Sequence, residues 1–213
     1  TLEYLLWGAE DAKQATAFTE RPRELDYLLA AAAALVQDSD TALTAWTEEG
    51  GYGAAFAASG TPDGLYARQS DAVQQLLNGM IEICDEVANG KIADPFKAQD
   101  RSLEESQFSH NSIRDFADNL RSVKFVYQGA RGDIASADSL SAFVRAQDAA
   151  LDERLNAEID DAIEAIEAIS KDGEPFTTAI TNPDKVDVIE AAQSAIRVVM
   201  ETLQGDVLPL VAR

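Results

Sequence analysis

Two short segments of this chain combine residue types that could bind a cation or a polar ligand. In the first, TLEYLLWG at residues 1–8, the carboxylate of Glu3 stands among apolar residues of an expected helix. A carboxylate with buried neighbours needs a positively charged partner or a metal ion, or it stays protonated. The second, EESQFSHNS at residues 104–112, gathers carboxylates, hydroxyls and an amide around Phe108. Both segments are candidate sites, although the second could equally serve to cap a helix.

Residue counts exclude most other catalytic and metal-binding patterns. The chain has one histidine, His110, so a zinc site with paired histidines cannot be built from these residues alone. We expect His110 to be exposed beside the start of a helix. The single cysteine, Cys84, excludes an internal disulfide, and its place on an apolar stripe predicts a buried thiol rather than a nucleophile.

The helix expected at 148–170 carries eight acidic residues against one arginine, Arg154. Carboxylates three and four positions apart share a helix face and could gather a hard cation. These residues flank an apolar stripe, however, as the solvated face of an amphipathic helix does. We therefore interpret them as a solvated face; they are Asp148, Asp152, Glu153, Glu158, Asp160, Asp161, Glu164 and Glu167.

Composition limits the possible partners. Apolar residues make up 46% and charged residues 26% of the 213 residues, which is typical of a globular protein with a sizeable core. With 17 basic and 38 acidic residues the net charge is −21, so the chain lacks the basic surface that binding to nucleic acid or anionic lipid requires. No apolar run reaches the length of about 18 residues that a transmembrane helix needs.

Apolar residues recur at three- and four-residue spacing through most of the chain, which predicts an all-α helical bundle. No segment alternates with a period of two, so we predict no strands. Thr61-Pro62, and Ser112 with Asp115, resemble helix starts, whereas residues 91–111 are expected to form a loop with one helical turn. The expected helices cover residues 22–50, 62–90, 112–129, 148–170 and the stretch from Pro183 to Leu203. Leu2, Leu5, Leu6 and Trp7 resemble the middle of a further helix, with no cap before them.

The two candidate segments resemble motifs of the imelysin family, also described as iron-regulated envelope proteins. The family signature is G-x-H-x-x-E followed by an apolar stretch that ends in Leu-Trp-Gly. Glu3 matches the glutamate and LLWG at residues 5–8 matches the end, while the histidine would fall immediately before Thr1. Residues 105–112, ESQFSHNS, resemble the family segment E-S-x-F-S-x-N-[ST]. Pro175-Phe176 with Ala179-Ile180 resembles its late Pro-Phe-x-x-Ala-Ile element.

The resemblance implies an all-α protein of two bundle-like halves whose signature residues meet between the halves. Residues 1–90 would then be the end of the first half and residues 91–213 the second half, with further helices and any signal segment or lipid anchor preceding this chain. The resemblance also implies a location in the periplasm or cell envelope of a bacterium and a role in iron acquisition. The expected partners are a metal ion or iron-related ligand and envelope iron-uptake proteins.

On this resemblance Glu3 and Glu105 are the expected metal ligands. Trp7 and Phe108 would wall a polar cleft, in which Ser106, Ser109 and Asn111 would orient the ligand. Because these donors are mostly oxygen atoms, they suit a hard cation such as ferric iron or calcium better than zinc. The resemblance favours iron, and zinc or calcium is less expected.

Two alternatives to a binding protein stay open. One is a metal-dependent peptidase, since the family was named as a metallopeptidase, with Glu3 as a metal ligand or base. The other is a non-catalytic bundle that binds a partner protein without a metal. We favour a binding protein over an enzyme because a zinc peptidase needs three protein ligands and a general base, which these residues supply poorly.

Overall fold

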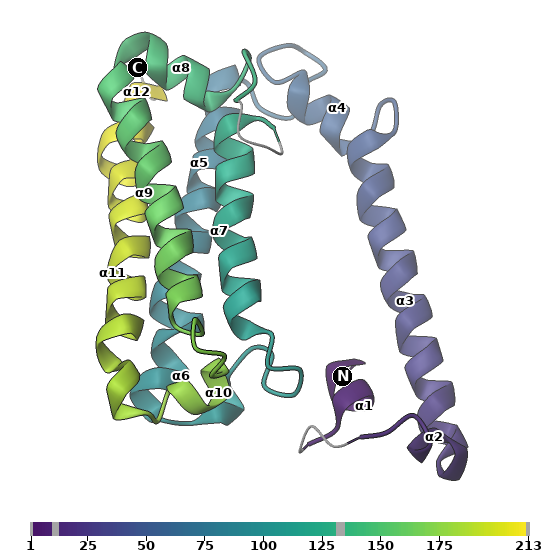
Figure 1. Cartoon of the computed structure of the whole chain (residues 1–213). Helices are drawn as coiled ribbons and strands as arrows, with labels where there is room; N and C mark the ends of the chain where they lie inside the picture. The colour runs from purple at the N-terminus through teal and green to yellow at the C-terminus, as the bar shows by residue number, and fades with distance from the viewer. Residues whose placement is uncertain (1, 10–12, 131–134, 212–213) are drawn as a thin grey trace. The chain divides into compact units, whose positions relative to one another are not determined.

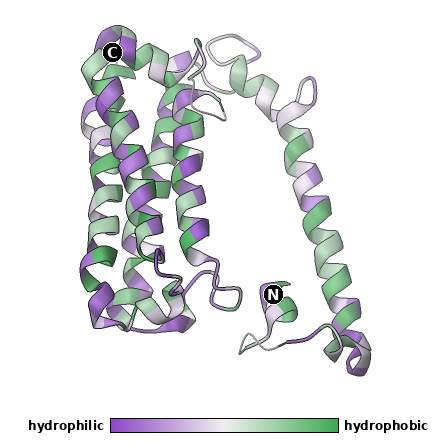
Figure 2. Cartoon of the chain, in the orientation of Figure 1, coloured by the Kyte–Doolittle hydropathy of each residue, from purple (hydrophilic) through white to green (hydrophobic). Residues whose placement is uncertain are grey.

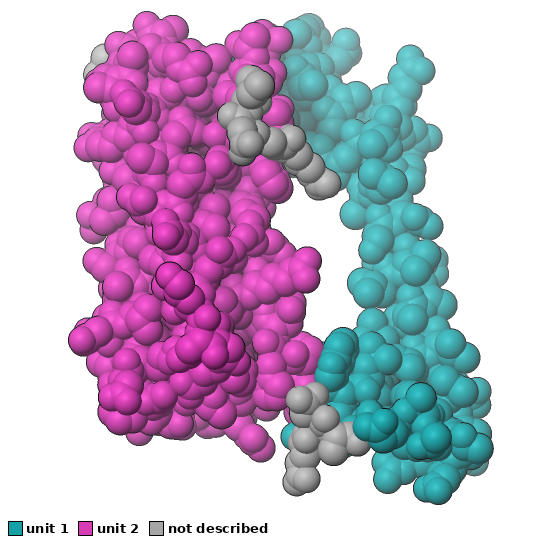
Figure 3. All heavy atoms as spheres, in the orientation of Figure 1, with its two compact units in different colours: residues 1–72 teal, residues 73–213 magenta. Residues whose placement is uncertain are grey.

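The computed structural model describes residues 2–9, 13–130 and 135–211, and in these ranges the chain forms helices and no strands. The all-α prediction is thus confirmed. The chain divides into two compact units, Thr1–Ala72 and Val73–Arg213 (Figure 3). The predicted division near residue 90 into two bundle halves follows a different boundary and stays a prediction. No helix in the described ranges is both long and apolar enough to cross a membrane.

Unit 1 is dominated by one long helix, α3, at Pro22–Thr47. Pro22 occupies the first turn, as predicted, because a proline there loses no hydrogen bond of the helix. The predicted apolar face is present but is not buried, and Figure 2 shows hydrophobic residues recurring along α3. The exposed large side chains of α3 are Leu25, Tyr27, Leu29, Leu35, Val36, Leu43 and Trp46. The other helices of the unit are α1 (Leu2–Trp7), α2 (Ala17–Glu20) and α4 (Tyr52–Ala57).

The predicted helix start at Thr61-Pro62 is wrong, because the chain makes tight turns there. The Thr61 hydroxyl donates backwards to the carbonyl of Ala58 at 2.8 Å instead of capping a helix. Gly64 approaches the same carbonyl so closely that a Cβ atom on it would lie 2.3 Å away. Helix α5 consequently begins only at Gln69.

Unit 2 is built around four long helices that lie side by side and alternate in direction (Figure 1). They are α5 (Gln69–Asp85, which crosses the boundary between the units), α7 (Ser112–Gln128), α9 (Ala149–Ala168) and α11 (Val186–Thr202). Shorter helices lie at the ends of the bundle: α6 (Ala93–Ala98), α8 (Leu140–Gln147), α10 (Phe176–Ala179) and α12 (Leu208–Val211).

Two π-helical segments extend the long helices beyond their predicted ends. One, Glu86–Lys91, continues α5 past the predicted stop at Gly90, and the other, Leu203–Val207, continues α11. The buried side chain of Gln193 on α11 donates to the backbone carbonyl of Ala88 at 2.8 Å. This contact from another helix stabilises the wider turn, which the apolar pattern of α5 alone does not specify.

The predicted apolar stripes form the core of unit 2. On α7 the stripe of Phe116, Leu120, Val123 and Tyr127 is at most 1% exposed. Burial of each such side chain contributes about 1.5–3 kcal/mol relative to leaving it in water. The matching buried residues on the neighbouring helices include Leu77, Met80, Cys84, Leu155, Ile159, Ala162, Ile166, Ile189, Ile196 and Val199.

One residue of the predicted solvated face of α9 is buried instead. Asp152 is 2% exposed, and its carboxylate accepts hydrogen bonds from Tyr127 of α7 at 2.9 Å and Ser141 of α8 at 2.7 Å. It also accepts one from Arg145 Nε at 2.7 Å, which forms an ion pair. Burial is the main cause that raises the pKa of the Tyr127 hydroxyl, and its hydrogen bond to Asp152 raises this pKa further. A buried carboxylate is tolerated here because donors from two other helices satisfy it.

We expect Cys84 to be protected from thiol reagents in the folded protein. Burial raises the pKa of the Cys84 thiol to about 12, and its side chain has no exposed surface. Only the thiolate is nucleophilic, so labelling by an aromatic disulfide at pH 8 should follow the unfolding of unit 2. A time course with increasing urea measures this. Rapid labelling without urea would contradict the burial of Cys84.

We expect Tyr127→Phe to destabilise unit 2 by about 1–3 kcal/mol, because the buried Asp152 carboxylate loses a donor. Urea unfolding monitored by the labelling of Cys84 measures the loss. Tyr52→Phe is the control, since it removes the same hydroxyl from an exposed ring, and should change stability by less than about 0.5 kcal/mol. Equal effects of the two substitutions would show that the hydroxyl of Tyr127 has no special role.

Candidate functional site

The segment 104–112 connects α6 to α7 and is preceded by a short 3₁₀ helix at Arg101–Leu103. The region predicted as a loop with one turn therefore contains two short helical elements. At its far end His110 adopts a left-handed conformation with φ 56°, which a residue with a side chain adopts only when its surroundings hold it there. The Nδ1 atom of His110 lies 2.8 Å from the hydroxyl of Thr177 on α10. His110 is half-buried, so its predicted exposure is wrong.

Five residues of this segment and of the first turn of α7 form a hydrogen-bonded group that we name the polar cluster: Glu104, Ser106, Asn111, Ser112 and Asp115. The Ser112 hydroxyl donates to Glu104 Oε1 at 2.7 Å and accepts the backbone N–H of Ser106 at 3.2 Å. The two oxygens of Asp115 accept from the Ser106 hydroxyl and the Asn111 amide, each at 2.6 Å. Two carboxylates thus belong to one network of neutral donors.

The structure brings together two residues to which the prediction gave a role, Ser106 and Asn111, and three to which it gave none. Of these three, Glu104 and Ser112 lie within the candidate segment 104–112, and Asp115 follows it. Glu104 and Ser112 are 4% and 0% exposed. Ser112 and Asp115 were expected to cap α7, and no side-chain cap is formed at this helix start. The three-residue spacing of Ser112 and Asp115 was the signal in the sequence that could have identified them. It identified polar residues of the first turn, but their partners come from residues 104–111, which the spacing does not specify.

Glu105, the predicted metal ligand of this segment, points to a lysine instead. Its carboxylate lies 3.0 Å from Lys91 Nζ, and Lys91 also lies 3.5 Å from Glu86. Lys91 ends the first π-helical segment, so the wider turn of the backbone brings its ammonium group to Glu105. The neighbouring Glu104 takes the buried position in the polar cluster.

Aromatic packing fixes the start of α7 on α10. The rings of Phe116 and Phe176 meet edge to face with centroids 5.4 Å apart, and both are buried. With the contact between His110 and Thr177, this packing joins the segment 104–112 to the Pro175-Phe176 element. The predicted site residues Phe108 and Ser109 are half-buried in the same segment.

A pocket of about 620 Å³ opens beside the polar cluster. Asn111 belongs to both, and the opposite wall includes Arg121 of α7 and Glu167 of α9, which form an ion pair. Arg121 also lies 2.7 Å from Asp118. The pocket is therefore polar and carries charges of both signs.

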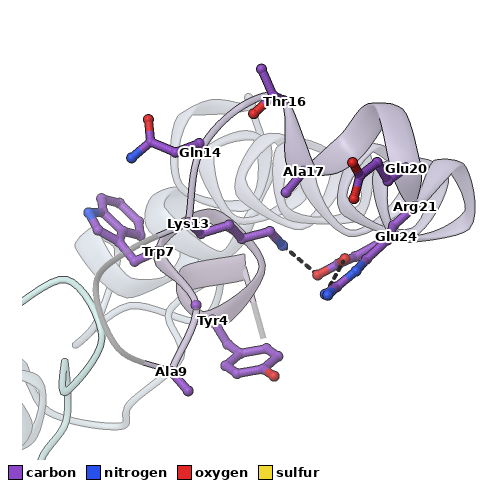
Figure 4. Close-up of a pocket in the computed structure, with 11 residues that line it drawn as sticks. Tyr4, Trp7, Ala9, Lys13, Gln14, Thr16, Ala17, Glu20, Arg21 and Glu24 are labelled. Carbon is purple, nitrogen blue, oxygen red and sulfur yellow. Dashed lines mark hydrogen bonds and ion pairs between the residues drawn. The ribbon is translucent and has the colours of Figure 1, made fainter.

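The other predicted site residues, Glu3 and Trp7, lie in unit 1. Glu3 is half-buried, and its neighbours Tyr4, Leu6 and Trp7 are 40–48% exposed. The expected apolar burial around Glu3 is therefore wrong, because only Leu5 of α1 is buried. Trp7 and Tyr4 line a pocket of about 500 Å³ in this unit (Figure 4).

The polar cluster offers oxygen donors only, namely carboxylates, hydroxyls and an amide. Such donors suit a hard cation, whereas zinc sites use imidazole and thiolate. Across the ranges that the structure describes, no group of three or more His, Cys, Asp or Glu residues is placed to hold a metal ion. By themselves, the described residues of the cluster therefore do not form a metal site.

We expect Ser112→Ala to destabilise unit 2 by about 1–3 kcal/mol, because the buried Glu104 carboxyl group loses a hydrogen-bond partner. The control is Ser122→Ala, whose exposed hydroxyl donates to a carbonyl of the same helix. It should change stability by less than about 0.5 kcal/mol. Urea unfolding of both variants measures the difference. A Ser112 variant as stable as the control would show that Glu104 does not depend on this hydroxyl.

Comparison with protein-family models matches residues 1–203 to the family described as imelysin, peptidase M75. Among curated proteins, iron-regulated protein A of Synechococcus elongatus is 29% identical over 188 residues, which are 87% of this chain and 52% of that protein. The chain therefore spans about half the length of the curated relative that it matches.

Two solved structures are similar in fold. An imelysin peptidase from Bacteroides ovatus superposes with a TM-score of 0.74 at 28% identity, covering 85% of this chain and 52% of that one. A candidate iron-regulated protein A precursor from Parabacteroides distasonis gives a TM-score of 0.77 at 27% identity, covering 88% and 56%.

Proposed function

This chain belongs to the imelysin family, and we propose that it is a cell-envelope protein of bacterial iron acquisition that binds ferric iron or an iron-related ligand. Two of its relatives are named for regulation by iron, which supports the iron part of the proposal. The envelope location is inferred from the family resemblance. An envelope location predicts that the natural protein is recovered in the periplasmic or membrane fraction of the cell.

The observation that carries the proposal is the polar cluster at the start of α7. The Ser112 hydroxyl donates a hydrogen bond to Glu104 at 2.7 Å, and the Ser106 hydroxyl donates one to Asp115 at 2.6 Å. Both carboxyl groups are therefore oriented before a ligand arrives. Groups positioned in advance lose less entropy on binding. Ferric iron is a hard cation that prefers such oxygen donors.

The pocket beside the cluster supports a ligand larger than a single ion. Its volume of about 620 Å³ lies within the usual range for small-molecule sites, roughly 300–1,000 Å³. Arg114 in its wall could pair with an acidic group of an iron chelate, since its ion pair with Asp118 is a long one of 3.8 Å, while Asn111 connects the pocket to the cluster. The net charge of −21 would raise the local concentration of cations, an effect that salt screens.

We expect protein purified without chelator to contain iron, and Asp115→Asn to lose it. Outer-shell substitutions at metal sites lower affinity by roughly 10–100-fold, and loss of a carboxylate ligand should lower it at least as much. Elemental analysis, followed by titration with ferric citrate, measures both. Glu3→Ala and Glu105→Ala test the two ligands predicted from the sequence.

Asp161→Asn is the matched control, since Asp161 is an exposed acid on α9 and should keep full iron binding. Iron lost from Asp115→Asn but kept in the control would support the polar cluster. Iron binding that is the same in all variants would contradict it. Absence of any metal would favour the alternative of a bundle that binds a partner protein.

A metallopeptidase is the second candidate, favoured by the similarity to the imelysin peptidase of Bacteroides ovatus. It predicts bound zinc and cleavage of casein that a chelator abolishes, with loss of cleavage in Glu3→Gln. Iron without cleavage would exclude this candidate.

A further inference from the structure

Lys13 is unusual because its long side chain is only 9% exposed, although lysine is rarely buried without partners. Its ammonium group donates to the carbonyl of Leu5 in α1 at 2.6 Å and to the carboxylate of Glu24 in α3. It also lies 4.4 Å from the ring centroid of Phe18 in α2, within the range of a cation–π contact. One side chain therefore contacts three helices of unit 1, and Figure 4 shows its contact with Glu24.

The backbone of Lys13 binds the same end of α1. Its N–H donates to the carbonyl of Trp7 at 3.3 Å, so residue 13 serves two carbonyls that the end of a helix leaves without partners. The chain can return to α1 because Gly8 adopts φ 79°, a conformation that side chains disfavour. A Cβ atom on Gly8 would also lie 3.2 Å from the Cβ atom of Lys13.

Helix α1 depends on such contacts because it is short. It has six residues, of which only Leu5 is buried, and a helix of this length is not stable in water by itself. The partner on α3 is well defined, since Glu24 also lies 3.6 Å from Arg21. The hydrogen bond from Lys13 is the main cause that lowers the pKa of Glu24, so this carboxylate stays ionised at neutral pH.

We propose that Lys13 is the positioning residue that holds α1, and with it Glu3 and Trp7, against α3. This inference rests on the proposed function in one respect, because it assumes that Glu3 and Trp7 take part in ligand binding. Lys13 itself acts through α1: its ammonium group is occupied by Leu5, Glu24 and Phe18. Loss of Lys13 would also open the pocket that Tyr4 and Trp7 line.

The test uses Trp7 as a reporter in the 213-residue chain with Trp46→Phe, where it is the only tryptophan. Lys13→Met keeps most of the stem and removes the charge, so acrylamide should quench Trp7 more strongly than in the parent chain, where Trp7 is 40% exposed. Lys13→Arg should restore much of the protection because it keeps a cation. Arg23→Met is the control, since Arg23 is an exposed cation on α3.

Labelling of Cys84 in each variant shows whether unit 2 is still folded. Should Lys13→Met unfold unit 1 entirely, Glu24→Gln is the milder variant, which keeps a hydrogen-bond acceptor but not the charge. It should give an intermediate degree of quenching. Quenching of Trp7 that is the same in Lys13→Met as in the parent would overturn the inference.

Titration of the same variants with ferric citrate separates this inference from the proposed function. If Glu3 binds the ion, as the family resemblance implies, Lys13→Met lowers iron affinity by roughly 10–100-fold, as loss of outer-shell support does elsewhere. Stronger quenching of Trp7 in Lys13→Met together with an unchanged iron affinity would show that Lys13 holds α1 but has no role in iron binding. A parent chain that binds no iron would overturn the proposed function, while the Trp7 measurement would still decide whether Lys13 holds α1.

Discussion

The position of α7 in unit 2 depends on the buried carboxylate of Asp152. Tyr127, near the end of α7, donates to this carboxylate, and Ser141 and Arg145 bring α8 to the same group. A buried charge is tolerated only when it is paired and hydrogen-bonded, so α7, α8 and α9 can pack together in essentially one way. At the opposite end of α7, Phe116 packs against Phe176. The helix is thus fixed at both ends, and its first turn is a rigid support for the polar cluster.

The polar cluster illustrates how a loop can be as well defined as a helix. Glu104, which is 4% exposed, would be costly to bury as a carboxylate without donors, and the hydroxyl of Ser112 meets part of that need. Asp115 in turn orders residues 106 and 111 through short hydrogen bonds. The residues that would bind a cation are therefore also the residues that fix the loop, and the left-handed His110 allows the chain to turn into α7.

The sequence predicted the fold better than the site. Long apolar stripes at helical spacing, such as the one from Phe116 to Tyr127, identify helices because burial of one face dominates their stability. Helix ends were harder to predict: Thr61-Pro62 has the residues of a cap but lies in turns that Gly64 makes possible. Asp152 was interpreted as solvated because it flanks the apolar stripe of α9. The local sequence does not indicate its burial, since its donors come from α7 and α8. Glu105 was chosen as a ligand because it matches the first residue of the family segment, and nothing local in the sequence indicates that its partner is Lys91, fourteen residues earlier.

We propose that the oxygen donors of the polar cluster bind a hard trivalent cation. The most direct measurement is solution NMR of the isotopically labelled chain titrated with gallium citrate, since Ga³⁺ is a diamagnetic substitute for ferric iron of similar size and charge. We predict saturable shifts of the backbone amides of Ser106, Ser112 and Asp115, and of their neighbours. Shifts confined to the exposed acids of α9, or no saturable shift at all, would contradict the claim.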